Sequence, residues 1–158
     1  MFHSKQAKNL LKLDKLLDPD LVIFLSSDQR SDALETLVDL LDKKGKLSDK
    51  QAFLNAIIER EKIVSTAIGM GVALPHAKLP EYKDFFIAVG IHPRGIAWDA
   101  LDQVPVRLVF LIGGPDDQQT RYLQLLSKLT LAVKDEERRK KILQLREPKD
   151  IIALFEGI

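Results

Sequence analysis

Two uninterrupted apolar runs constrain the fold of this chain more than any other feature. They read FFIAVGIH over residues 85–92 and VRLVFLIGG over residues 106–114. Strands with apolar side chains at successive positions, rather than at alternate ones, lie in the middle of a sheet that is covered on both faces. A third run, LVIFLSS at 21–27, contains β-branched residues and predicts another buried strand. The chain therefore needs helices on two faces of one sheet.

Helices that supply this cover are predicted before and after the strands. Their expected ranges are residues 31–45, 48–62, 116–133, 135–145 and 148–156. Ser31 and Ser48 suit the N-cap positions of the first two, because serine oxygens accept from free backbone N–H groups. In the third helix, Leu123, Leu126 and Leu129 are expected to face inward. The pattern indicates a single α/β domain with a covered sheet.

Composition narrows the function classes. The chain has 158 residues, 24 Lys and Arg against 23 Asp and Glu, and a net charge of +1, so no overall field attracts nucleic acid or anionic membrane. The run DEERRKK (135–141) pairs acids with bases four positions apart, which predicts a solvated helix face. The absence of cysteine excludes disulfides and thiol catalysis within the sequence. With no signal peptide and no run of ~18 apolar residues, a cytoplasmic protein without membrane insertion is expected.

The central segment, IVSTAIGMGVALPHAKLP (63–80), draws attention to one histidine. We expect a strand, a tight turn, a second strand and then a loop that carries His76 after Pro75. Imidazole titrates near physiological pH and attacks as a neutral nucleophile. Gly69 and Gly71 allow backbone N–H groups to turn toward an incoming anion. The alternative interpretation is a histidine that is hydrogen-bonded in a loop and performs no chemistry.

Other kinds of site find little support. His3 and His92 lack metal-ligand spacing to His76, so no metal site is expected, and His92 is predicted to be a solvated loop residue after a strand. Neither Ser65 nor Ser127 lies in a G-x-S-x-G elbow of a serine hydrolase. The GGPDD loop lacks the ending of a nucleotide-binding P-loop.

Taken whole, the central segment resembles the signature of phosphotransferase-system enzyme IIA domains of the fructose/mannitol class, which includes nitrogen-regulatory members. The matching positions are Glu59-Arg60, Ser65-Thr66, Ile68-Gly69 and Gly71-Val72-Ala73-Leu74-Pro75-His76. Similar stretches run along nearly the full chain, so residues 1–158 are expected to form one such domain. The resemblance implies a mixed β-sheet flanked by helices on both faces, and a cytoplasmic phosphocarrier without a cofactor.

The resemblance also implies roles for particular residues. His76 would accept a phosphoryl group from the small carrier HPr or a paralogue, and Arg60 would stabilise that group. The remaining phosphate-pocket residues would be Ser65, Thr66, Gly69, Gly71 and Tyr122. The group would then pass to a cysteine of an enzyme IIB, or remain as a regulatory signal to partner proteins.

Two departures from the family pattern matter. Ala67 replaces a glycine, and a left-handed backbone there would cost roughly 1 kcal/mol. Tyr122 stands where many members carry a second histidine, and a phenol cannot become cationic. Together with the absence of a fused IIB or a receiving cysteine, Tyr122 favours a free-standing regulatory enzyme IIA. A sugar-transport enzyme IIA, or a regulatory binding module that is never phosphorylated, remains the alternative.

Overall fold

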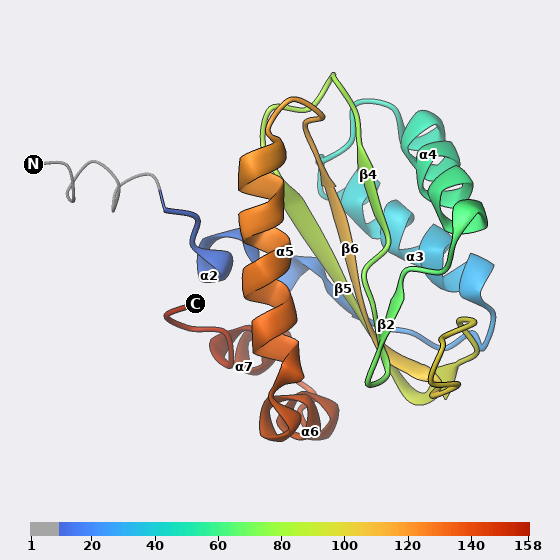
Figure 1. The fold of residues 1–158 in the computed structure, drawn as a ribbon, viewed down its shortest axis with the longest axis vertical. Coiled ribbons are helices and arrows are strands. Elements are labelled where there is room, and N and C mark those ends of the chain that lie inside the picture. Colours follow the sequence, from blue (N-terminus) through green and yellow to red (C-terminus); the bar gives the residue numbers. More distant parts are fainter. Residues whose placement is uncertain (1–9) are drawn as a thin grey trace, which may run out of the picture.

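The structure, a computed structural model, describes residues 10–158 as three layers, with one sheet between two groups of helices (Figure 1). The strands are β1 (Val22–Phe24), β2 (Ala67–Gly69), β3 (Val72–Ala73), β4 (His76–Lys78), β5 (Phe86–Ile96) and β6 (Val106–Gly114). The helices are α2 (Leu13–Leu16), the 3-10 helix η1 (Pro19–Leu21), α3 (Arg30–Lys43), α4 (Lys50–Ile63), α5 (Gln119–Lys134), α6 (Glu136–Gln144) and α7 (Pro148–Ala153). This arrangement confirms the predicted α/β fold.

The sheet is mixed, and the two long apolar runs form its centre. Its strand order is β1-β5-β6-β3-β2, and β4 also pairs with β6. Strands β5 and β6 are antiparallel, whereas β1 is parallel to β5. Both β3 and β4 run parallel to β6. The central position of β5 and β6 explains why their sequences are apolar at successive positions.

Alternate residues of the central strands face two separate cores. In β5, Ile87 and Val89 pack with α5 and the C-terminal helices, whereas Phe86 and Ala88 pack with α3 and α4. Figure 1 shows the same division, with α3 and α4 on one side of the sheet and α2, α5, α6 and α7 on the other. Within residues 10–158, no helix is both long and apolar enough to cross a bilayer.

The first two long helices begin close to the predicted serines but are capped by other residues. Gln29 is the N-cap of α3, so Ser31 lies inside the helix. Asp49, not Ser48, caps α4, and its carboxylate accepts a hydrogen bond from the backbone N–H of Ala52 at 3.0 Å. An acidic cap also complements the helix dipole, which explains why the aspartate replaces the neighbouring serine in this role.

Helix α5 is rotated relative to the predicted orientation. Its buried positions include Tyr122, Leu125 and Leu129, whereas Leu123 is 54% exposed. The expectation that Leu123 faces inward was wrong, because the buried stripe follows 122, 125 and 129 at helical spacing. This rotation places Tyr122 against the sheet.

The segment around Pro75 forms a strand where a loop was expected. Residues of β3 pair with Leu108 and Val109, and after a two-residue gap β4 resumes the pairing, with His76 opposite Ile112. Pro75 has no N–H to contribute to the ladder, but its carbonyl accepts from the backbone N–H of Ile112 at 2.9 Å. His76 therefore sits on a strand rather than on a loop.

Candidate functional site

His76 is held in a defined tautomer at the start of β4. Its Nδ1 lies 3.1 Å from the carbonyl oxygen of Leu74. Because a carbonyl oxygen only accepts, Nδ1 carries the proton and the lone pair is on Nε2. Burial lowers the pKa of His76 below its ordinary value of 6.5, the bond to Leu74 opposes this, and the positive charge of Arg60 lowers the pKa further. The ring is thus neutral at neutral pH and presents Nε2 as its nucleophilic atom.

A small cleft of about 210 Å³ adjoins His76. Its lining residues come from the end of α4, β2 and the segment before it, the β3–β4 region, and α5. They are Arg60, Ser65, Thr66, Ala67, Ile68, Leu74, His76, Tyr122 and Leu126. The structure therefore brings together five of the predicted site residues, which are far apart in sequence: Arg60, Ser65, Thr66, His76 and Tyr122.

Tyr122 closes one side of the cleft. Its ring centroid lies 5.7 Å from that of His76, and the ring also stacks on Phe85 at a centroid distance of 6.0 Å. The hydroxyl oxygen is buried and has no hydrogen-bond partner among residues 10–158. Burial raises the pKa of Tyr122 to about 12, so the phenol stays protonated. Tyr122 thus brings to the cleft lining a buried phenol whose hydroxyl has no acceptor among residues 10–158.

Arg60 supplies positive charge from the last turn of α4. Its Nη1 donates to the carbonyl oxygen of Val64 at 2.9 Å, which anchors the guanidinium at the helix end. The charge of Arg60 acts in the direction of a lower pKa for both His76 and Tyr122. A guanidinium in this place suits an anion with several oxygens, such as a phosphoryl group.

Ser65 and Thr66 form the cleft wall, and their hydroxyls donate inside the protein. The Oγ of Ser65 donates to the carbonyl oxygen of Trp98 at 2.6 Å. The Oγ1 of Thr66 donates to Oε1 of Glu61, also at 2.6 Å. Since each hydroxyl has one proton, neither donates to an anion in this arrangement. Their contribution to the site is the shape of its wall.

Glu61 is a polar residue behind the cleft wall that was not predicted from the sequence. It is only 6% exposed, and its carboxylate accepts from the backbone N–H and the hydroxyl of Thr66 and from the indole N–H of Trp98. A signal was present: Phe53, Ile57 and Glu61 follow at four-residue intervals on the buried face of α4. A carboxylate at an inward position needs buried donors, and here it joins α4 to the cleft wall.

Gly69 and Gly71 lie outside the cleft, which corrects the expectation that they present N–H groups to an anion beside His76. They flank the β2–β3 turn with φ of 88° and 75°, and Met70 between them has φ 61°. The backbone N–H of Met70 donates to Asp102 Oδ2 at 3.0 Å. Ala67, on the cleft wall, lies in β2 and does not have a positive φ, so its replacement of glycine causes no strain there.

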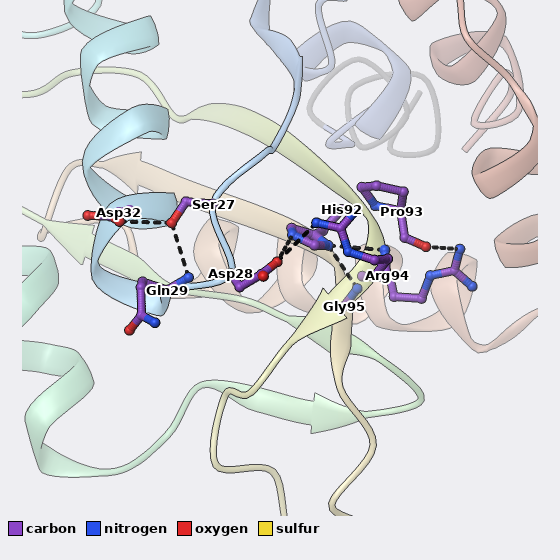
Figure 2. A network of polar contacts seen from close by, with 9 residues as sticks. Ser27, Asp28, Gln29, Asp32, His92, Pro93, Arg94 and Gly95 are labelled. Carbon is purple, nitrogen blue, oxygen red and sulfur yellow. Dashed lines mark hydrogen bonds and ion pairs between the residues drawn. The ribbon is translucent and has the colours of Figure 1, made fainter.

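His92 is buried in β5, which corrects the prediction of a solvated loop residue. Its Nδ1 accepts from the backbone N–H groups of Arg94 and Gly95 at 3.1 and 2.8 Å, and its Nε2 lies 3.0 Å from Asp28 Oδ1 (Figure 2). The ring thus accepts hydrogen bonds from two backbone N–H groups where the pairing of β5 with β6 is irregular. His3 lies outside the described residues. Within residues 10–158, no group of three metal-ligating side chains occurs.

The fold and the sequence together define a component of the phosphoenolpyruvate-dependent sugar phosphotransferase system. The model of the family described as "Phosphoenolpyruvate-dependent sugar phosphotransferase system, EIIA 2" matches residues 15–157. The chain belongs to this EIIA family, as its central segment had indicated.

Relatives in this family have two kinds of name. The fructose-specific EIIABC component of Bacillus subtilis is 35% identical over 146 residues, which are 92% of this chain but only 23% of that protein. The fructose-specific EIIA component of Haloferax volcanii is 34% identical over 75% of this chain and 77% of its own length. The nitrogen regulatory protein of Bradyrhizobium diazoefficiens is 32% identical over 77% of this chain and 78% of its own length.

Solved structures confirm the fold. The nitrogen regulatory protein IIA-Ntr of Neisseria meningitidis matches with a TM-score of 0.83 at 24% identity, over 90% of this chain and 98% of that one. Mannitol IIA of Escherichia coli matches with a TM-score of 0.74 at 20% identity, over 88% of this chain and 98% of that one.

Proposed function

We propose that this protein carries a phosphoryl group on Nε2 of His76, accepted from HPr or a paralogous carrier, and that it serves mainly as a regulatory enzyme IIA. The observation that carries the proposal is the fixed tautomer of His76. Its Nδ1 is hydrogen-bonded to Leu74, so Nε2 is the nucleophilic atom. The cleft beside it is also lined by the guanidinium of Arg60 and by Tyr122, whose hydroxyl has no partner within the described part of the chain.

The proposed transfer needs positioning and charge more than covalent help from the protein. The lone pair of Nε2 forms a bond to phosphorus while the N–P bond to the carrier breaks. The Nδ1 proton stays on its bond to the Leu74 carbonyl, so the ring becomes positive as the phosphoryl group arrives. Arg60 balances the charge on the phosphoryl oxygens, and Tyr122 offers them a neutral O–H donor.

The onward step separates the two candidate roles. A sugar-transport enzyme IIA hands the group to an IIB cysteine, and relatives with sugar-specific names are consistent with that alternative. A solved complex of Escherichia coli mannitol enzyme IIA with phosphorylated enzyme IIB has the same fold for its IIA part, with a TM-score of 0.73 at 18% identity, over 89% of this chain and 96% of that one. Tyr122 favours the regulatory role, since a phenol, unlike a second imidazole, has no cationic form near neutral pH. The proposed partners, HPr and regulatory proteins, place this role in the cytoplasm.

Phosphorylation from phosphoenolpyruvate tests the proposal. The protein is incubated with enzyme I and HPr, and the product is examined by intact-mass measurement and ³¹P NMR. We expect one acid-labile phosphoryl group on Nε2 of His76, none in His76→Ala, and full labelling of the control variant His3→Gln. Label on His92 or His3, or full labelling of His76→Ala, would refute the assignment.

Transfer to isolated fructose- or mannitol-type IIB domains then separates regulation from transport. We expect the phosphorylated protein to transfer slowly and Tyr122→His to transfer faster, because a second imidazole can take up a proton near the phosphoryl group. Wild-type transfer as fast as that of Tyr122→His would favour the transport role.

A further inference from the structure

A lysine ammonium lies against the ring of Tyr122, close to the phosphoryl site. The Nζ of Lys78 is 4.1 Å from the centroid of the Tyr122 ring. The same atom donates to Oε1 of Gln119 at 2.8 Å. Gln119 and Tyr122 are three positions apart on α5, so they lie on neighbouring parts of one helix face. The lysine is thus held by one α5 side chain over the ring of another.

The strand β4 explains why this lysine accompanies His76. Side chains alternate along a strand, so His76 and Lys78 face the same side while Ala77 packs into the opposite core. Pairing with β6 fixes both positions, because His76 lies opposite Ile112 and Lys78 opposite Gly114. The ring of Tyr122 therefore lies next to both the imidazole of His76 and the ammonium group of Lys78.

We propose that Lys78 is a positioning residue of the phosphohistidine site and acts through Tyr122. A cation over an aromatic face draws electron density from the ring, which makes the phenol a stronger hydrogen-bond donor. The Tyr122 hydroxyl is buried and has no hydrogen-bond partner among the described residues, and Tyr122 lines the same cleft as His76. The acceptor that the proposal assigns to this hydroxyl is a phosphoryl oxygen on Nε2 of His76. The fixed ammonium thus brings positive charge to a site whose tyrosine cannot itself be charged.

The inference rests on the proposed function, and the charges around His76 are consistent with it. Arg60 and Lys78 both act to lower the pKa of His76, whereas Glu61 raises it. Lys78 therefore acts on the imidazole directly, in addition to its contact with the ring of Tyr122. This influence can be measured in the unphosphorylated protein and does not depend on phosphoryl transfer.

Lys78→Met tests the inference because methionine keeps a comparable length without the charge. We expect Lys78→Met to lower the equilibrium constant for phosphoryl transfer from phospho-HPr roughly 3- to 5-fold, which is the scale of one cation–π contact. The phosphorylated fraction at equilibrium measures this change in phosphoryl retention. The pKa of His76, followed by NMR in the unphosphorylated protein, should rise. Lys78→Arg should restore retention, since a guanidinium also stacks on aromatic rings. Lys83→Met, which removes an exposed lysine before β5, serves as the control and should change neither quantity.

A double-mutant cycle shows whether Lys78 acts through the phenol. In a Tyr122→Phe background, Lys78→Met should weaken retention by less than about 1.5-fold, because the hydroxyl that it strengthens is gone. Equal losses in both backgrounds, or wild-type retention in Lys78→Met, would overturn the inference while leaving the proposed function intact. If the wild-type protein itself accepts no phosphoryl group, the proposed function fails, and with it the inference. Thermal midpoints within about 2 °C of wild type verify that each variant is folded.

Discussion

Replacing Glu61 with glutamine tests whether its buried carboxylate holds the cleft wall to α4. The carboxylate accepts three hydrogen bonds, two from Thr66 and one from the indole of Trp98. A glutamine oxygen can still accept at one position, but its NH₂ group would then face the backbone N–H of Thr66. One buried donor loses its acceptor and meets another donor, a cost of about 1–3 kcal/mol. We therefore expect Glu61→Gln to lower the free energy of unfolding by about 2 kcal/mol.

Urea unfolding followed by circular dichroism measures this loss, and a decrease of about 4–8 °C in the thermal midpoint should accompany it. The neighbouring carboxylate provides a matched control. Glu59 is exposed and pairs only with Lys62 at 3.2 Å among the described contacts, so Glu59→Gln should change stability by less than about 0.5 kcal/mol. Equal, small effects of the two substitutions would refute the argument that Glu61 anchors the cleft wall.

Three further predictions concern the site and the core. Arg60→Ala should slow phosphorylation from phospho-HPr at least ~10-fold, measured by rapid quench, because the guanidinium no longer stabilises the phosphoryl oxygens. The free energy of unfolding should fall by less than about 1 kcal/mol, because only one hydrogen bond to a backbone carbonyl is lost. Because the pKa of His76 is lower in the folded protein than in the unfolded chain, protonation of this histidine favours unfolding. The contribution of His76 to the free energy of unfolding is therefore fully present above pH 6.5 and is lost as the pH falls below that value. Urea titrations at several pH values should show this decrease in the free energy of unfolding in wild type and not in His76→Gln. Gly113→Ala should destabilise the protein by more than about 2 kcal/mol in urea titrations, because the added methyl group would overlap the ring of Phe86 in the core.

The central strands and the helices were predictable because burial alone determines their patterns. Runs 85–92 and 106–114 were predicted as strands covered on both faces, and they occupy the middle of the sheet. The cleft residues His76, Arg60 and Tyr122 were also identified, although by resemblance rather than by periodicity. Arg60 and His76 belong to one short motif with fixed spacing, and Tyr122 was placed by its position in the family pattern, so all three were named before their contacts were known.

The errors at the two glycines and at His92 share a physical cause, which is that a local pattern does not show where tertiary hydrogen bonds go. Gly69 and Gly71 suited an anion-binding turn, but Asp102 from a distant loop takes the N–H between them. His92 follows an apolar run and resembles a loop residue, yet its ring accepts two backbone N–H groups and is buried. Glu61 drew no prediction, because its partner Trp98 lies 37 positions away in the sequence.

The position of His76 on β4 has a consequence for how its state would be detected. Backbone hydrogen bonds to β6 brace the strand on both sides of the imidazole, at Pro75 and at the residues paired with Ile112–Gly114. A phosphoryl group that arrives there would add about two negative charges to a scaffold with little freedom to rearrange. Ile68, which lines the cleft, is an exposed apolar side chain, and so are Ile63 and Val64 at the end of α4 and Leu123 next to Tyr122 in α5. A partner would therefore discriminate between the two states by the electric potential of one rigid surface, so its preference should weaken as ionic strength rises.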